Sequence, residues 1–439
     1  MMDPSNPDVP VSPDAPTMPP PAPCPSRPGG RFAETIRYAT SALCIGLLFL
    51  GIVWRLVNLD YPRTFSFDEH HFVSNARNYM AHRHDWNDHP PLGKLVLVPA
   101  MKIFGDRGLG WRLSSALLGL AIVALVGLCA AKIFKDRRAG LLAAVFAAID
   151  GFYLSYARTA LIDNPLTAFI FAALALMLWG RSLGWFAGAA VCVGLAVASK
   201  WTGACVLLLT PFLLRRARRS AWHALWMVAV ASLVYLAIGV FALYTTRQPI
   251  SAAGILRSNW HLLQHHAGFT VWDNAASSKW YTWPLLFHPI VMHHENIGNG
   301  MVRATSSIGN ILLWFATTGA ILLAMAGWAR GLYRRLRRHV PIHDLQWREG
   351  FVLLGMVALT LPFIVTHRQS YIFHYLGAYG LGLGMLAARL ARIERRSSLA
   401  VLGFLLCATA VSMVYLPLWT GGAQSQQAFN LRLPFASWR

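Results

Sequence analysis

The sequence predicts an all-α integral membrane protein with about eleven transmembrane helices and two long outer loops. Of the 439 residues, 56% are hydrophobic and only 13% are charged, whereas about a quarter of the residues in an average soluble domain are charged. The apolar residues also occur in long blocks with the charged residues between them, as is typical of transmembrane helices. This composition excludes a disordered chain and argues against an ordinary soluble enzyme.

The first 30 residues are rich in proline and show no apolar periodicity. We expect residues 1–30 to form a disordered cytoplasmic tail and residues 31–439 to form one multi-spanning domain. The tail lacks the short apolar core and the cleavage site of a signal peptide.

Apolar blocks follow the tail, and each of them predicts one helix. Several blocks are shorter than the about 20 residues that usually cross a bilayer. If 202–214 is a re-entrant segment instead of a span, the sidedness of every later segment is reversed. The blocks are 38–57, 113–131, 140–157, 165–179, 184–198, 202–214, 222–245, 308–329, 350–366, 371–388 and 399–419.

The basic residues predict the orientation of these helices. The net charge is +21, from 39 Lys and Arg against 18 Asp and Glu. With the N-terminus inside, the short inner loops carry the basic clusters and the short outer loops carry few basic residues, as the positive-inside rule expects. We therefore predict a multi-pass protein of the cell (inner or plasma) membrane with a cytoplasmic N-terminus, and no nucleic-acid partner.

The two long outer loops, 58–112 and 246–307, contain Trp, His, Asp and Pro. This composition is typical of ordered loops that carry function. The first loop contains adjacent acids, Asp68 and Glu69, between two phenylalanines. Burial beside aromatic rings raises the pKa of a carboxyl group toward the range that is useful for a general base. The alternative is a solvated loop with an incidental pair of acids.

Two other features of the first loop suggest a ligand. Pro90 and Pro91 predict a rigid turn, and Gly93 would let the backbone approach a ligand closely. Asp68, Glu69 and the histidines after them also suggest a metal site, but neighbouring residues rarely converge on one ion. The six cysteines are scattered and indicate neither disulfides nor zinc.

Four further clusters lie on the predicted outer face. Cations in them would hold a phosphate, and aromatic rings would contact a sugar or a lipid. The alternatives are an Arg–Asp loop clamp, a lysine that snorkels to the headgroups, and aromatic anchors at the membrane surface. A channel would instead carry polar residues along its spans. These clusters are residues 156–165, 199–203, 277–284 and 367–375.

These motifs resemble, in order, the signatures of the protein O-mannosyltransferases. Asp68-Glu69 followed by His-Pro-Pro-Leu-Gly-Lys is the most specific pair, and the likeness covers about residues 35–439. The loop 246–307 is too short for the β-trefoil insert of fungal and animal members. The motifs that carry the resemblance are residues 68–72, 89–94, 158–163, 199–203, 280–284, 368–375 and 415–417.

The resemblance implies a C-type glycosyltransferase architecture. The implied enzyme moves mannose, with inversion, from polyprenyl-phosphate-mannose to Ser or Thr hydroxyls of exported proteins at the outer face. It also implies that Asp68 is the catalytic base, with Glu69 beside it at the acceptor, and that no metal or cofactor is bound. Predicted ligands of the donor phosphate are Arg112, Arg158, Lys200 and Arg368. Further site candidates are His71, His89, Lys94, Asp163, Trp201, Trp283 and His374.

Other functions remain open at this stage. A related enzyme would use a lipid-phosphate-linked sugar to modify a lipid or a cell-wall glycan. A lipid or sugar transporter and a structural scaffold are further alternatives, although the lack of an inverted repeat argues against a transporter. The predicted partners are the lipid-linked donor, secreted or membrane acceptor proteins, the export machinery and the bilayer.

Overall fold

The structure is a computed structural model that describes residues 28–85, 88–180, 182–268, 276–366 and 369–439, without the side chains of 28–33. The predicted tail lies outside the described residues up to residue 27. Residues 28–30 form the first turn of the first helix.

A helix or a pair of short helices occupies each predicted apolar block. Six helices are long and apolar enough to cross a membrane, and the pair α6–α7, bent by 61°, makes a seventh span if it is counted as one. The multi-pass helical architecture is confirmed, whereas the number of eleven spans stays a prediction. The elements are α1 (Pro28–Leu56), α5 (Gly108–Phe134), α6 (Arg137–Ile149), α7 (Gly151–Ala157), α8 (Asp163–Trp179), α9 (Leu183–Ser199), η1 (Trp201–Leu209), α10 (Thr210–Arg216), α11 (Trp222–Thr245), α13 (Ile311–Arg338), α14 (Asp344–Val365), η3 (Ile372–Tyr375), α15 (Leu376–Glu394) and α16 (Ser398–Thr420).

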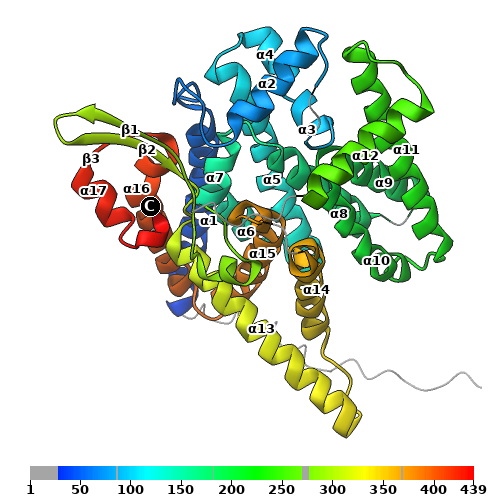
Figure 1. Cartoon of the computed structure of the whole chain (residues 1–439). Coiled ribbons are helices and arrows are strands. Elements are labelled where there is room, and N and C mark those ends of the chain that lie inside the picture. The colour runs from blue at the N-terminus through cyan, green and yellow to red at the C-terminus, as the bar shows by residue number, and fades with distance from the viewer. Residues whose placement is uncertain (1–27, 86–87, 181, 269–275, 367–368) are drawn as a thin grey trace, which may run out of the picture.

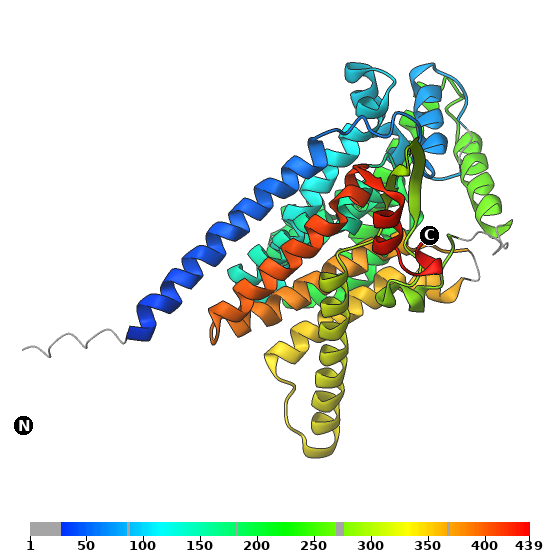
Figure 2. The same ribbon diagram turned by 90° about the vertical axis from the view of Figure 1, so that its left-hand side faces the viewer.

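Both long loops fold into defined elements. The elements α2, α3 and α4 gather at one end of the helix bundle, which we call the loop end (Figure 1). The arginine-rich end of α13 projects from the opposite end (Figure 2). The loop elements are α2 (Glu69–Met80), α3 (Leu92–Leu95), α4 (Val98–Phe104), α12 (Ala252–Gly268), η2 (Trp280–Leu285), β1 (Val291–Gly298) and β2 (Met301–Ser306).

A small antiparallel sheet corrects the all-α prediction. β1 and β2 form a hairpin, and β3 (Ala423–Ser425) pairs with the other edge of β2. Asn299 and Gly300, both at positive φ, make the turn, and Asn-Gly is a strong sequence signal for a tight hairpin. α17 (Gln426–Arg432) and η4 (Ala436–Trp438) follow β3.

The break between α6 and α7 is built around Asp150. One carboxylate oxygen accepts hydrogen bonds from the amides of Phe152 (2.9 Å) and Tyr153 (3.4 Å) and so caps α7. The other oxygen accepts from the amide of Asn310 (3.0 Å) and from the hydroxyl of Tyr379 (3.1 Å). One buried acid therefore ties the kinked span to α13 and α15.

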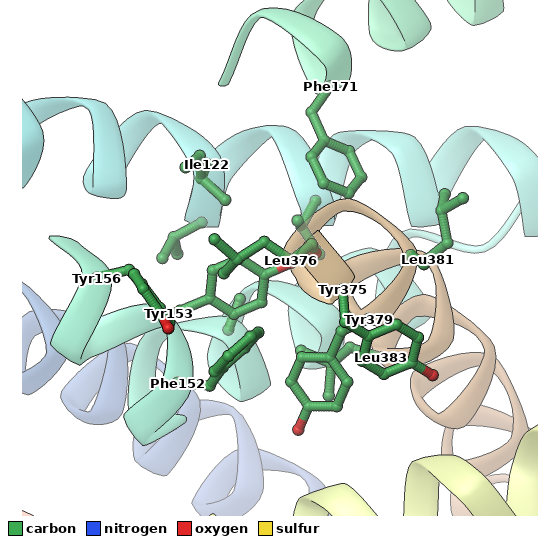
Figure 3. Close-up of a cluster of buried hydrophobic side chains, with 14 of the residues drawn as sticks. Ile122, Phe152, Tyr153, Tyr156, Phe171, Tyr375, Leu376, Tyr379, Leu381 and Leu383 are labelled. Atoms are coloured by element: carbon green, nitrogen blue, oxygen red, sulfur yellow. Dashed lines mark hydrogen bonds between the residues drawn. The ribbon is translucent and has the colours of Figure 1, made fainter. Parts of the chain in front are cut away.

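Aromatic side chains fill the core around this break (Figure 3). Phe152 lies edge-on to Tyr379, with 5.8 Å between the ring centroids, and Trp314 stacks on Tyr379 at 4.3 Å. Such pairs stabilise a core by about 0.5–1.5 kcal/mol beyond the area that they bury. The cluster fixes α7 against α13 and α15 beneath the loop end.

We predict that Gly151→Ala lowers the thermal stability of the protein in detergent. A Cβ at Gly151 would lie 1.8 Å from Cε2 of Trp419, and Trp419 is held by a 2.8 Å hydrogen bond from its indole to the carbonyl of Ile308. Overpacking of this kind costs typically about 1–3 kcal/mol. Gly403→Ala is the control, because a Cβ at that position would meet no atom within 4 Å. Equal melting temperatures for the two variants would contradict the packing described here.

Candidate active site

Asp68 stands at the start of α2, in a backbone segment that is pinned to β1. Phe67 has a positive φ of 48°. This conformation costs a non-glycine residue about 1–3 kcal/mol and persists only where the surrounding structure holds it. The carbonyl of Met292 accepts a hydrogen bond from the Phe67 amide (2.8 Å) and one from the Ser66 hydroxyl (3.4 Å). β1 therefore fixes the backbone position from which the side chain of Asp68 projects.

Glu69 is fully buried, and its carboxylate is saturated with hydrogen bonds. Arg112 binds both oxygens, through Nε at 2.8 Å and Nη2 at 2.7 Å. The amides of Ser66 and Ala160 each donate a further bond at 2.8 Å. This environment corrects the prediction that Glu69 faces the acceptor, because the carboxylate has no acceptor site left for a substrate.

Asp68 has the opposite environment. Its side chain is half-buried, and among the described residues no hydrogen bond or ion pair reaches its carboxyl group. Burial raises the pKa of Asp68, and the charge of Asp163 raises it further, whereas His71, His70 and Lys200 lower it. Of the two adjacent acids, Asp68 alone is available to take a proton, and burial makes it a stronger base.

Arg112 has no N–H group left for a phosphate, which corrects its predicted role. Besides Glu69, its guanidinium donates to the carbonyls of Leu59 (3.3 Å), Pro62 (2.7 Å) and Thr64 (3.1 Å). These bonds use the five N–H groups of an arginine. Arg112 holds the loop before Asp68 against α5.

Arg158 also has a structural role that differs from the prediction. It is 5% exposed, and its guanidinium donates to the carbonyls of Trp54 (2.8 Å), Val57 (2.8 Å) and Asn58 (2.9 Å) at the end of α1. A cation at this position stabilises the negative end of the helix dipole. The contacts of Arg158 explain its burial without a ligand.

Lys200 and Asp163 form an ion pair of 2.9 Å at the ends of the neighbouring helices α9 and α8. The ammonium also lies 5.0 Å from the ring centroid of Phe373. Within the described part of the chain, Asp163 is the one hydrogen-bond acceptor of Lys200, which has three N–H groups. The Phe373 ring lies 6.1 Å from that of Phe67, the residue before Asp68, so Lys200 is the predicted phosphate ligand that the structure places near the base, and its charge lowers the pKa of Asp68.

Lys94 is buried among acids instead of facing a substrate. It pairs with Asp85 at 2.8 Å and with Asp88 at 3.6 Å, and Asp85 also accepts from the hydroxyl of Tyr79 at 2.8 Å. A Cβ on Gly93 would lie 2.6 Å from Ile162, so the predicted close approach at Gly93 is to the chain itself. Asp85 and residues 88–94 thus form a bonded support beside the site.

The predicted histidines lie around the rim of the site. His71 is exposed, with its ring centroid 3.7 Å from that of His70. His89 lies between Phe72 (6.2 Å) and His266 of α12 (5.1 Å). The ring of Trp201 is 5.6 Å from His266. His266 was not among the predicted site residues, because nothing in the sequence places α12 beside the first loop.

Trp283 and His374 form a second aromatic group. Trp283 is buried and donates to the hydroxyl of Ser278 at 3.0 Å, and its ring lies 6.1 Å from His374, which stacks on Phe363 at 4.0 Å. These contacts describe packing at the end of α14. Arg368, the remaining predicted phosphate ligand, lies outside the described residues.

An apolar groove of about 1130 Å³ runs beside α14. Tyr375 and Pro284 line it, together with Phe212 and Met356, and its far end reaches Lys135 and Arg216. Tyr375 is two residues from Phe373, over which Lys200 lies. The lining of the groove thus includes residues close in sequence to Phe373, although neither Phe373 nor Lys200 lines it.

Three family models match successive parts of the chain. Residues 45–111 and 88–244 match two models described as dolichyl-phosphate-mannose-protein mannosyltransferase. Residues 251–438 match the C-terminal four-transmembrane region of protein-O-mannosyltransferase. The chain belongs to the protein O-mannosyltransferase family. The resemblance found in the sequence motifs is confirmed.

Relatives and solved structures agree with this assignment. The polyprenol-phosphate-mannose–protein mannosyltransferase of Mycobacterium tuberculosis is 29% identical over 97% of each chain, and that of Mycolicibacterium smegmatis is 28% identical over 95% of this chain and 96% of the relative. The Saccharomyces cerevisiae Pmt1-Pmt2 complex bound to the sugar donor superposes with a TM-score of 0.78, at 14% identity, over 91% of this chain and 92% of that one. ArnT from Cupriavidus metallidurans, bound to undecaprenyl phosphate, has a TM-score of 0.53 at 17% identity, over 90% of this chain and 76% of that one. The C-type glycosyltransferase fold is thus shared.

We predict that Arg112→Gln destabilises the protein far more than Arg395→Gln. Removal of one partner of a buried ion pair costs about 3–5 kcal/mol, because the other charge stays buried, and neither Arg112 nor Glu69 is exposed. Arg395 pairs with Asp136 at 2.7 Å, but its side chain is 68% exposed, and such pairs contribute about 0–1 kcal/mol. Thermal unfolding in detergent measures the difference. Similar melting temperatures would rule out the central role of Arg112.

Proposed function

We infer that the protein is a membrane glycosyltransferase that transfers mannose from polyprenyl-phosphate-mannose to Ser or Thr hydroxyls of exported proteins. The mannosyltransferase family models and the named relatives support this reaction. The observation that carries the assignment of the site is the half-buried carboxyl of Asp68, which lies near the cation Lys200 at the loop end. That pair supplies a proton acceptor for the hydroxyl and a charge for the donor phosphate.

In the proposed mechanism, Asp68 takes the proton of the acceptor hydroxyl while the hydroxyl oxygen attacks the anomeric carbon of mannose. The new C–O bond forms on the face opposite to the phosphate, and the bond between the sugar and the phosphate breaks with its electron pair going to the phosphate. The product polyprenyl phosphate is stable as an anion, so the reaction needs no strong general acid. Attack from the opposite face inverts the anomeric centre.

The donor is proposed to bind along the groove beside α14. The apolar groove offers a long surface to a polyprenyl chain, and the two remaining N–H groups of Lys200 are directed to the phosphate. Arg368 stays a predicted second ligand. Within the described part of the chain, no three His, Cys, Asp or Glu side chains come together as metal ligands, and we propose that catalysis is independent of a metal ion.

The loop end is proposed to face the outside of the cell membrane. α2, which Asp68 immediately precedes, and the arginine-rich end of α13 lie at opposite ends of the bundle (Figures 1 and 2), and basic segments stay in the cytoplasm. Acceptors would reach the site as they leave the membrane, so the export machinery is a proposed partner.

We predict that Asp68→Asn lowers transfer by about 10²–10⁴-fold, the usual contribution of a general base. The assay is incorporation of radiolabelled mannose from polyprenyl-phosphate-mannose into a peptide with one threonine. Glu34→Gln, which changes an exposed acid near the start of α1, serves as the control and should keep the rate of the unaltered protein. A chelator should leave the rate unchanged. Full activity of Asp68→Asn would refute the assignment of the base, and label in lipid instead of peptide would favour a lipid-modifying enzyme.

We also predict the pH dependence of kcat/KM. The base acts when deprotonated, so the rate rises with pH through the pKa of Asp68, which burial raises above its usual range. The positive charges of His70 and His71 lower this pKa. Their replacement in His70→Gln/His71→Gln should shift the acidic limb to higher pH. A shift to lower pH, or no shift, would show that Asp68 does not control the limb.

A further inference from the structure

β1 has a free edge that the rest of the fold does not use. The strand order is β1-β2-β3, so one side of β1 pairs with β2 and the other side is an edge. Residues 294–298 are exposed. After Met292, no described residue makes a backbone hydrogen bond to this edge. An exposed edge of this kind is a template for the addition of another strand.

The free edge begins directly beside Asp68. The carbonyl of Met292 accepts the amide hydrogen of Phe67 at 2.8 Å, and Asp68 is the next residue of the chain. Phe67 therefore occupies the edge at Met292. A strand added along residues 293–297 must end at this point, within one or two residues of the base.

Near its start, β1 makes side-chain contacts on both faces, whereas its edge is open among the described residues. Side chains alternate between the two faces of a strand. On one face, Tyr61 donates from its hydroxyl to Glu295 at 3.2 Å and lies edge-on to His293 at 5.9 Å. On the other face, Phe429 lies 5.2 Å from His294. A polypeptide that pairs with this edge would bind the backbone of the strand.

We propose that the acceptor polypeptide adds as an extended strand to the free edge of β1 and so delivers its hydroxyl to Asp68. This inference rests on the proposed function, because it requires a polypeptide acceptor. Pairing through main-chain hydrogen bonds recognises a polypeptide with few demands on its side chains. Three or four paired residues would span about 10–13 Å, with the Ser or Thr at the end nearest Met292.

The test is a scan of N-methyl groups along the backbone of an acceptor peptide with one threonine. Strand residues direct their amides alternately to the two sides, so N-methylation at every second position on one side of the threonine should raise KM at least tenfold. N-methylation at the positions between them should change KM by no more than about twofold, and kcat should change little for any of the peptides. N-acetyl-threonine amide, which is too short to pair with β1, is the reference acceptor.

Other results would overturn the proposal. Strand addition is excluded if the effect of N-methylation on KM does not alternate along the peptide, or if N-methylation outside the threonine has no effect on KM. A tenfold loss for the peptide in Ile297→Ala, which removes only an exposed side chain, would mean recognition by side chains. If the edge instead pairs with a second copy of this chain, the peptide scan shows no alternation. If the unaltered protein transfers mannose to neither the peptide nor the threonine derivative, the proposed function itself is refuted.

Discussion

The buried ion pair between Glu69 and Arg112 is the interaction on which the candidate site depends. Two charges removed from water are stabilised only when each is fully bonded, and here both are. Their partners come from the loop before α2, from α5 and from the segment before α8. The pair therefore joins three parts of the chain at one point, and Asp68 is the residue next to that point.

Buried arginines in this protein are distinguished by their partners. Arg158 binds the last carbonyls of α1, and Arg55 of α1 in turn binds the carbonyls of Ala147 and Ala148 at the end of α6. These cations neutralise helix ends that would otherwise carry unpaired carbonyl groups in an apolar surrounding. Lys200 differs, because a single carboxylate among the described residues accepts from an ammonium with three N–H groups. Each of the two arginines thus binds at least three carbonyl groups, whereas the cation proposed to bind phosphate has one acceptor among the described residues.

The same contacts explain how far the sequence alone could predict the fold and the site. Hydropathy located the apolar blocks, since each block must be buried in lipid or protein wherever it lies. The acid pair was also found, but its division into a bonded and an available carboxyl depends on Arg112, which is 43 residues from Glu69. Arg158 looked like a phosphate ligand because its partners are backbone carbonyls about 100 residues away, and these leave no motif. The hairpin did have a local signal, Asn299-Gly300, but the all-α prediction left it out.

The charges around Asp68 suggest how donor and base are coupled in the proposed mechanism. Before the donor binds, Asp163 already compensates Lys200, and the two have opposite effects on the pKa of Asp68. A donor phosphate held by Lys200 would add a negative charge on the same side of the carboxyl group. An added negative charge raises the pKa of a carboxylate further, which makes it a better proton acceptor at the moment when the sugar is in place. In this way the binding of the lipid-linked sugar would itself strengthen the base that the transfer requires.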